Sequence, residues 1–427
     1  MKVAFYTLGC KANQFETQAL ERLFTERGHE LVPFDGFADV YVVNTCTVTA
    51  LSDKKSRNAA RRCKRIHPES KLILCGCYAQ TKPEEAKVLC GADAVLGTPD
   101  KSRVVDVAEG LAEDGVRELW SGEAPAFDRL PAGGLQGRTR ALLKIQDGCK
   151  SFCTYCLIPY ARGPERSIPF AFAVSEAERL AREGFREIVL TGIEISAYGR
   201  DLPGQPSLIS LIEALCKAAP GVRFRLGSLE PRTVTEDFAA RCAPIPNLCP
   251  QFHLSLQSGC DATLKRMNRR YTAARFAESC RLLRQYLPGC AITTDLIVGF
   301  AGETEQDFHE SLDFVRQCAL CKVHIFPYSR RKGTKGYDLP GQIPNAQKAL
   351  RAAEAAKVCD ALERDYLCSM LGQTKAVLFE QQEDGWYFGH IPEYCLVKVK
   401  GEGLQNQVLR VRLTGLDGTT LIGEVSE

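Results

Sequence analysis

The sequence predicts an α/β protein of three parts: an N-terminal α/β domain with a parallel sheet, a central partial (β/α)6 barrel and a small C-terminal all-β barrel. Three observations predict this class. The chain has 427 residues, which is too many for one ordinary domain. Short apolar runs alternate with helix-like stretches up to about residue 330. After Gly372 only strand-like alternation remains.

Residues 1–120 form the predicted N-terminal domain. Its apolar runs, which read as strands, are KVAFYTLG, DVYVVNT, KLILCG and DAVLG. Each run is followed by a helix-like stretch, and these stretches cover about 14–28, 51–66, 83–90 and 100–112. Because strands and helices alternate, the sheet is expected to be parallel. The segment 121–138 is rich in Gly and Pro and predicts a linker.

Residues 139–340 form the predicted barrel. Its six candidate strands are ALLKIQ, EIVLTG, RFRLGS, FHLSLQ, ITTDLIVGF and KVHIFP. A full barrel has eight βα units, so six indicate an open or partial one. Chemistry in such folds lies at the C-terminal ends of the strands.

The last part of the chain begins where PGQIPN interrupts the barrel pattern. A connecting helix is predicted over 345–371. Five short strands follow within 372–427, and they predict a small barrel.

The composition is that of an ordinary globular protein, with 45% hydrophobic and 25% charged residues. The net charge of +3 says little about a partner, so a nucleic-acid site would have to come from local clusters. No apolar run approaches the roughly 18 residues of a membrane span, and the N-terminus shows no cleavage site. We therefore expect a cytoplasmic protein. In a reducing compartment, twenty cysteines indicate metal binding or catalysis rather than disulfides.

The segment GCKSFCTYC directly follows the first predicted barrel strand and contains Cys149, Cys153 and Cys156, here called the loop trio. A structural zinc site would need a fourth ligand, and no His or Cys follows within fifty residues. A complete 4Fe–4S site has four cysteine ligands, so three would leave one iron open to a substrate or cofactor. Chance remains an alternative in a chain so rich in cysteine.

Three further cysteines each follow a predicted strand of the N-terminal domain. They are Cys10, Cys46 and Cys77, here called the strand-end trio. Parallel strands end at one edge of a sheet, so these thiols can converge and bind a second cluster. The alternative is three buried core cysteines, which spacing alone would favour.

The sequence segments around these cysteines resemble those of the methylthiotransferase branch of the radical S-adenosylmethionine (SAM) enzymes. The similar segments are GCKANQ, NTCTVT, GCYAQ, DGCKSFCTYCLIPYARGPERS, SLQSGCDATLKRMNRRYT, TTDLIVGFAGETEQDF and HIFPYSRRKGTKG. The resemblance spans nearly the whole chain and includes a C-terminal TRAM domain, a small RNA-binding barrel. TLGCKANQ and GCYAQ are most similar to the tRNA enzymes that act on N6-threonylcarbamoyladenosine (t6A). The enzyme for isopentenyladenosine typically has GCQMN at this first cysteine, and the ribosomal-protein enzyme has GCPKN.

The resemblance implies that the strand-end trio holds an auxiliary 4Fe–4S cluster and the loop trio holds the radical SAM 4Fe–4S cluster. One SAM would methylate sulfur carried on the auxiliary cluster. A second would give the radical that removes hydrogen from C2 of the adenine next to the anticodon, so that 2-methylthio-t6A forms. An aromatic C–H offers no acidic proton, so the radical has to come from the cofactor. No catalytic residue beyond the cluster ligands is assigned.

Five residues are expected to bind SAM. The resemblance implies that Tyr155 packs the loop against adenine, and its alternative role is a plain turn aromatic. Gly192 would let the backbone approach SAM closely, with Glu194 nearby, where many relatives carry His. Glu230 and Gln257 end the third and fourth barrel strands, and each is otherwise a solvated loop residue.

Three basic clusters in separate parts of the chain fit a large polyanion, because phosphate contacts dominate such affinity. One lies on a helical face within 53–65, one follows the last barrel strand, and one alternates outward along two C-terminal strands. Outward charge on strands is usually mere solvation. The expected RNA-binding residues are Lys54, Arg57, Arg61, Arg65, Arg330, Arg331, Lys332, Lys398, Lys400, Arg410 and Arg412.

The expected partners are tRNA, through its anticodon stem-loop, and an electron donor such as a flavodoxin or ferredoxin. No membrane and no stable protein partner are implied. An electron-transfer protein with two clusters would keep four cysteines for each cluster. An RNA-binding protein with structural metal would hold zinc. Among enzymes, the alternatives are methylthiolation of isopentenyladenosine in tRNA or of a ribosomal protein.

Overall fold

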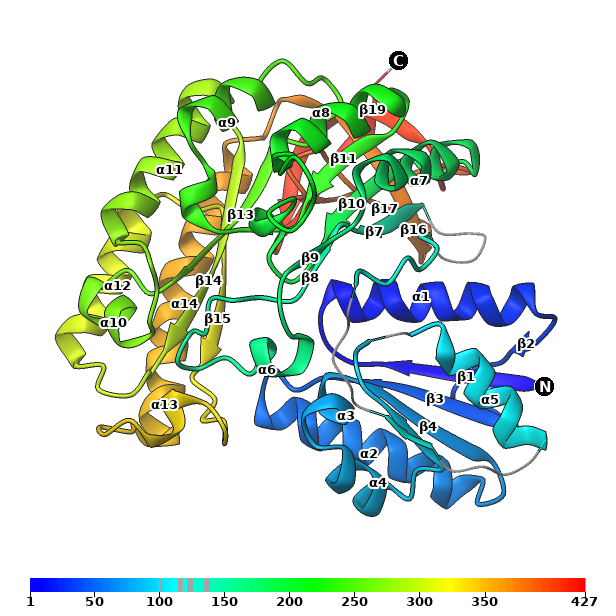
Figure 1. Ribbon diagram of the computed structural model, residues 1–427. Helices are drawn as coiled ribbons and strands as arrows, with labels where there is room; N and C mark the ends of the chain where they lie inside the picture. Colours follow the sequence, from blue (N-terminus) through cyan, green and yellow to red (C-terminus); the bar gives the residue numbers. More distant parts are fainter. Residues whose placement is uncertain (100, 114–117, 121–125, 134–138, 427) are drawn as a thin grey trace.

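The protein is seen in a computed structural model that describes residues 1–99, 101–113, 118–120, 126–133 and 139–426. A parallel-sheet domain, a larger barrel-like part and a small closed barrel follow one another along the chain (Figure 1). The predicted α/β fold class is therefore confirmed. The limits drawn between the domains stay predictions.

The N-terminal sheet has the strand order β2-β1-β3-β4-β5-β6, and neighbouring strands in it run parallel. Its strands are β1 (Lys2–Thr7), β2 (Glu30–Leu31), β3 (Val40–Thr45), β4 (Lys71–Gly76), β5 (Ala94–Leu96) and β6 (Glu118–Trp120). Its helices are α1 (Lys11–Glu26), α2 (Ala50–Ile66), α3 (Cys77–Thr81), α4 (Pro83–Cys90) and α5 (Arg103–Glu113). Helices α1 and α5 cover one face and α2 to α4 the other, so the sheet is buried on both sides (Figure 1).

Four details of this domain differ from the prediction, and two of them are the short strands β2 and β6, which were not predicted. Helix α1 begins at Lys11, directly after Cys10, rather than near residue 14. Helix α3 was not predicted, because five residues are too short to show a helical period. Of the predicted linker, residues 126–133 are neither helix nor strand, and 121–125 and 134–138 lie outside the described residues.

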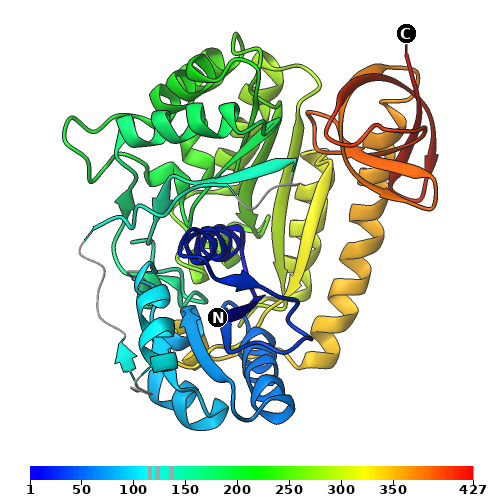
Figure 2. The same ribbon diagram turned by 90° about the vertical axis from the view of Figure 1, so that its right-hand side faces the viewer.

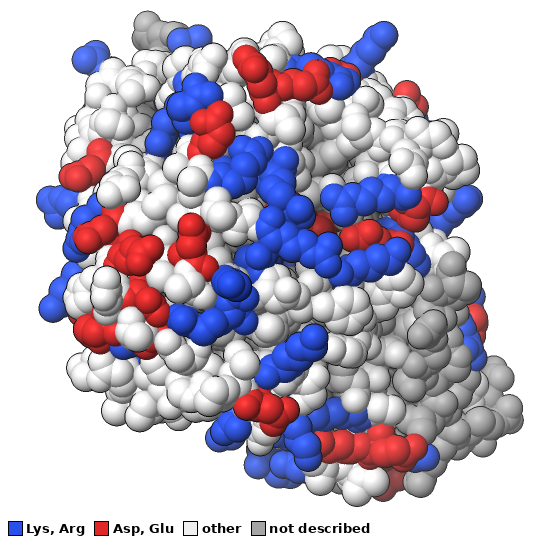
Figure 3. All heavy atoms as spheres, turned by 60° about the vertical axis from the view of Figure 1, so that its left-hand side comes forward, with Lys and Arg blue, Asp and Glu red and all other residues white. Residues whose placement is uncertain are grey.

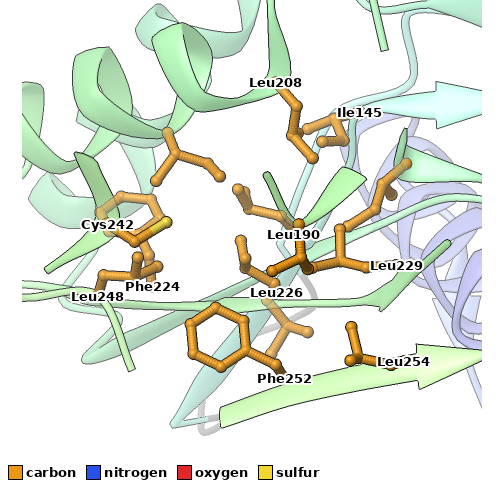
Figure 4. Packing of buried hydrophobic residues seen from close by; sticks show 14 of the residues in the cluster. Ile145, Leu190, Leu208, Phe224, Leu226, Leu229, Cys242, Leu248, Phe252 and Leu254 are labelled. Atoms are coloured by element: carbon orange, nitrogen blue, oxygen red, sulfur yellow. The ribbon is translucent and has the colours of Figure 1, made fainter. Parts of the chain in front are cut away.

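The central part contains parallel strands in two hydrogen-bonded sheets, β11-β10-β7 and β12-β13-β14-β15. The strands are β7 (Arg140–Lys144), β10 (Glu187–Thr191), β11 (Arg223–Leu226), β12 (Ser228–Leu229), β13 (Gln251–Gln257), β14 (Ala291–Val298) and β15 (Lys322–Pro327). The covering helices are α7 (Phe170–Arg182), α8 (Leu208–Ala218), α9 (Glu236–Cys242), α11 (Ala273–Tyr286) and α12 (Glu305–Gln317), with the short α10 (Asp261–Arg266). Figure 4 shows Leu190, Leu226 and Phe252 packed in the core that joins strands to helices. This core fixes the strand ends that carry the site.

The long helix α14 (Asn345–Cys368) runs along the barrel and leads into the small barrel (Figure 2). The small barrel closes in the order β16-β17-β18-β20-β19. Its strands are β16 (Thr374–Glu383), β17 (Trp386–His390), β18 (Leu396–Lys400), β19 (Val408–Asp417) and β20 (Thr420–Val425). Val397 and Val399 are buried while Lys400 is exposed, as strand alternation requires. A helix that is long and apolar enough to cross a membrane is not found among the described residues.

Candidate active site

The strand-end trio meets at one edge of the N-terminal sheet. Strands β1, β3 and β4 are neighbours, with Thr7 opposite Asn44 and Asn44 opposite Cys75. Cys10 and Cys46 therefore follow strand ends that lie side by side, and Cys77 begins α3 beside them. A Cβ atom built on Gly9 would lie 2.9 Å from Cys46 Sγ, so the first two segments are in close contact.

Backbone geometry and burial hold Cys77 in place. Gly76 has a φ of +94°, and a Cβ there would lie 2.4 Å from Asn44 Oδ1 and 2.6 Å from the Thr45 carbonyl oxygen. Only glycine fits this turn. Burial raises the pKa of Cys77 to about 12, against the lowering effect of Arg162, and Cys10 and Cys46 are near enough to add to the rise.

The loop trio follows β8 (Gln146–Asp147), and hydrogen-bond donors surround its sulfur atoms. The Ser151 N–H donates to Cys149 Sγ and the Ile158 N–H to Cys156 Sγ, both at 3.4 Å. Arg269 Nη1 donates to Cys153 Sγ at 3.2 Å. Donors aimed at sulfur stabilise thiolates, which are the form that binds iron. The loop therefore fits an iron–sulfur cluster.

The spacing of the sulfur atoms argues against a single ion in either trio. Among the described residues, neither trio brings all its Sγ atoms within 4.8 Å of one another. Ligands of one tetrahedral zinc ion lie closer together than this. In a 4Fe–4S cluster each thiolate binds a different iron, so wider spacing is expected. The separation within each trio is therefore wider than one tetrahedral ion requires.

A buried ionic network lies between the two trios and joins α1 to the barrel. The Arg162 guanidinium donates to Glu16 Oε1 at 2.6 Å and to Asp147 Oδ1 at 3.0 Å. Lys144 Nζ lies 3.0 Å from Glu16 Oε1 and 3.2 Å from Asp147 Oδ2. Burial alone would raise the pKa of Glu16, but Arg162 and Lys144 overcome it and lower that pKa to about 2. Because Asp147 lies two residues before Cys149 and Arg162 lies near Cys77, this network ties one trio to the other.

Glu194 and Arg269 lie beside the loop trio. Glu194 is enclosed by protein, and its Oε1 accepts no hydrogen bond from any described residue. Burial raises the pKa of Glu194, while the nearby Arg269 acts against the rise. A buried carboxylate oxygen without a partner and a guanidinium next to it can bind an ammonium and a carboxylate. SAM carries both groups on its amino acid part.

The other residues expected to bind SAM lie at the same strand ends. Tyr155 packs edge-to-face on Phe300, with ring centroids 6.4 Å apart. Gly192 follows β10, and a Cβ there would lie 2.7 Å from the Gln146 carbonyl oxygen. Glu230 follows β12, and its carboxylate accepts from Arg232 at 2.7 Å. Gln257 ends β13 with a φ of +69°.

A cavity of about 830 Å³ opens inside the barrel beside the strand-end trio. Its walls come from Cys10 and Lys11, from the barrel strands including Gly192 and Asp295, and from the small-barrel loop that holds Tyr394. Polar groups lie in its wall: His253 Nδ1 lies 3.0 Å from Thr293 Oγ1, and His253 Nε2 lies 3.4 Å from Asp295 Oδ2. The volume lies within the range of about 300–1,000 Å³ that is common for ligand sites.

The residues expected to bind RNA fall into two groups. Most are exposed or half-buried, namely Lys54, Arg57, Arg61, Arg65, Arg330, Lys332, Lys398, Lys400, Arg410 and Arg412. Arg331 is only 5% exposed, and its guanidinium lies 2.8 Å from Asp53 Oδ2. This ion pair joins the barrel to the N-terminal domain, so the prediction that Arg331 contacts RNA is wrong. Arg57 and Arg61 also bond within the protein, to Glu85 and the Leu89 carbonyl.

Sequence reasoning missed three residues at this site: Lys11, Arg162 and Arg269. Lys11 and Arg162 lie within segments that were singled out for their cysteines, so they had a weak signal. Arg269 lies 113 positions beyond the last loop cysteine, within the segment SLQSGCDATLKRMNRRYT that carries the family resemblance, but its contact with Cys153 is not marked in the sequence.

Comparison with known proteins agrees with this geometry. Residues 143–315 match the Radical SAM superfamily, and residues 2–97 match Uncharacterized protein family UPF0004. In fold, the chain is similar to the radical S-adenosylmethionine methyltransferase TsrM from Kitasatospora setae, with a TM-score of 0.59 and 16% identity over 79% of this chain and 75% of that chain. The fold and the loop thiols thus define a radical SAM enzyme.

Two relatives give the narrower class. The chain is 36% identical to the threonylcarbamoyladenosine tRNA methylthiotransferase MtaB of Bacillus subtilis, over 96% of this chain and 93% of the relative. It is 39% identical to the protein of the same name from Aquifex aeolicus, over 82% and 86%. The chain therefore belongs to the family of the threonylcarbamoyladenosine tRNA methylthiotransferases. This confirms the predicted resemblance and the expected cofactors, SAM and two 4Fe–4S clusters.

Proposed function

We propose that this protein converts t6A next to the anticodon of tRNA into 2-methylthio-t6A. One observation carries the proposal: a single cavity has Cys10 of the strand-end trio in one wall and, in another, Gly192, two residues before the Glu194 that lies near Cys149. A base in this cavity would meet the strand-end trio directly and approach the loop trio from the Gly192 side. The names of the family's members support the same substrate.

In this proposal the strand-end trio holds the auxiliary cluster and the loop trio holds the radical SAM cluster. When bound, the clusters and SAM supply the radical and the methylated sulfur. Arg269 and Glu194 bind the carboxylate and the ammonium of SAM, and Tyr155 packs near its adenine. Gly192 leaves room for the backbone to approach, while Glu230 and Gln257 line the same rim.

The surface supports a polyanionic substrate. Lys and Arg side chains gather in a band on the face drawn in Figure 3, with carboxylates on either side. Lys332, Lys400, Arg410 and Arg412 are exposed, and we propose that they contact phosphates together with the other basic residues named above, Arg331 excepted. We further propose that the enzyme acts in the cytoplasm, where tRNA is available, and takes electrons from a flavodoxin or ferredoxin.

The test is anaerobic incubation of the reconstituted protein with SAM, dithionite and tRNA that carries t6A, followed by nucleoside mass analysis. A methylthio adduct on t6A is the expected result. Parallel reactions with isopentenyladenosine tRNA and with ribosomal protein test the two alternative substrates. Unchanged t6A together with SAM cleavage would contradict the proposed substrate.

A further inference from the structure

Lys11 is an accessible cation in the wall of the cavity. It is the first residue of α1 and follows Cys10 directly, so its side chain enters the cavity beside the strand-end trio. Its ammonium lies 5.8 Å from the centroid of the Tyr394 ring, which belongs to the small-barrel loop. The Lys11 side chain is exposed, so a ligand in the cavity can reach its ammonium.

The other cations in this region have carboxylate partners. Arg140 Nη2 lies 2.7 Å from Glu380 Oε2, and Arg225 Nε lies 2.9 Å from Glu187 Oε1. The second lysine of the cavity wall, Lys322, lies 2.9 Å from Glu363 Oε1. Lys11, by contrast, forms no ion pair with any carboxylate in the described part of the chain.

The carboxylates near Lys11 already have partners. Of the three in the cavity wall, Glu363 and Glu393 pair with Lys322 and Lys375, and Asp295 faces His253. Arg223 also binds Glu187, at 2.6 Å, so the two carboxylates Glu187 and Glu380 serve three arginines before Lys11 is counted. An anionic group of a ligand in the cavity can therefore pair with the exposed Lys11 ammonium without displacing a carboxylate of the protein.

We propose that Lys11 binds the threonyl carboxylate of t6A and thereby selects this base. The inference rests on the proposed function. In adenine, C2 and the carbon that bears the N6 substituent are both bonded to N1, so the substituent flanks the edge that reacts. A residue next to an auxiliary-cluster ligand is therefore within reach of that substituent when C2 faces the cluster. The isopentenyl group is apolar and offers Lys11 no charge.

The experiment uses the reconstituted enzyme and two anticodon stem-loop RNAs, one with t6A and one with the threonyl carboxylate as its methyl ester. Anaerobic fluorescence anisotropy gives Kd, and initial rates give KM and kcat. For the wild type, the ester is expected to raise Kd and KM roughly 10- to 100-fold, the loss of one charge-assisted hydrogen bond. Lys11→Gln is expected to raise them similarly for the acid RNA and less than about twofold for the ester.

Matched variants separate recognition from damage. Lys11→Arg keeps the charge and is expected to keep the preference for the acid RNA. Lys322→Gln removes the other cavity lysine and is expected to leave the ratio of acid to ester affinity unchanged, whatever its effect on rate. Iron content and visible absorbance of Lys11→Gln check that the neighbouring Cys10 still holds its cluster.

The outcomes are distinct. If the wild type makes no methylthio adduct on the acid RNA, the proposed function fails and the role of Lys11 fails with it. If the adduct forms but the wild type binds acid and ester equally well, the proposed function stands and the role of Lys11 is refuted. The comparison of acid and ester RNA uses the wild-type enzyme alone, so its result does not depend on whether Lys11→Gln folds correctly.

Discussion

The two cysteine trios are expected to bind the same kind of cluster, but different parts of the fold position their thiols. The loop trio lies within eight residues, and main-chain N–H groups of Ser151 and Ile158 donate to two of its sulfurs. The strand-end trio spans residues 10–77, and the register of β1, β3 and β4 brings it together. A single loop positions one trio, and the strand register of a sheet positions the other. Substitutions should therefore affect the two sites separately.

The largest expected effect comes from removing ligands. Replacing the loop trio with alanine is expected to lower bound iron from about eight to about four per chain and to abolish SAM cleavage. The same change in the strand-end trio is expected to lower iron equally but to leave SAM cleavage, with no methylthio product. Iron analysis, deoxyadenosine release and nucleoside mass spectra measure the three quantities. An unchanged iron content after either triple substitution would show that the substituted trio does not hold a cluster.

The next largest effect is a loss of stability when the buried Arg162, which lies between the two trios, is replaced. Arg162→Met leaves Glu16 and Asp147 with fewer partners, and breaking a buried pair costs about 3–5 kcal/mol. Since Lys144 still contacts both carboxylates, we expect about 3 kcal/mol. Denaturant unfolding measures it. The matched control is Arg27→Met, whose solvent-exposed pairs with Asp106 and Glu109 should contribute far less to stability.

The same network predicts how stability changes with pH. The folded pKa of Glu16 is lowered to about 2, so the folded state favours the charged form more than the unfolded state does. The resulting stabilisation is present above the unfolded pKa near 4.5 and is lost as pH falls toward 2. The free energy of unfolding, measured from pH 5 down to about 2, should fall in that window. The fall should be smaller in Glu16→Gln.

A smaller effect separates the trios again, through the glycine before Cys77 and the one before Cys149. Gly148 has a φ of +75°, and a Cβ there would lie 1.9 Å from the Pro164 carbonyl oxygen, whereas on Gly76 it would meet Asn44 and Thr45. Each alanine variant is expected to cost about 1–3 kcal/mol and to lower the occupancy of its own cluster only.

Gly28→Ala is the control for these two glycines. Gly28 also has a positive φ, +81°, but a Cβ there meets nothing within 4 Å. It should show backbone strain of about 1 kcal/mol without loss of iron. Equal iron loss in all three variants would show that strain, and not contact with the cysteine segments, controls the clusters.

Sequence patterns predicted one trio better than the other for a physical reason. C-x3-C-x2-C is a short contiguous motif, so it can be recognised in the sequence without knowledge of the fold. The convergence of the strand-end trio could be inferred because apolar runs marked β1, β3 and β4 and parallel strands end at one edge, but its assignment to a cluster came from the family resemblance. Arg269, Arg162 and the free charge of Lys11 depend on side-chain contacts between distant segments. Arg331 was misjudged for the same reason, since its partner Asp53 lies 278 positions away.

The smallest expected effect tests whether helices or strands set the strand-end trio. Thr49 is the N-cap of α2, the helix that follows Cys46, and its hydroxyl accepts from the Ser52 N–H at 3.1 Å. Thr49→Ala should cost about 1 kcal/mol and lower Tm by about 2 °C. Strand register, and not this cap, positions Cys46, so iron content should not change. Thr49→Ser keeps the acceptor and should match the wild type. Iron lost from Thr49→Ala but not from Thr49→Ser would instead give the helix cap a part in holding the cluster.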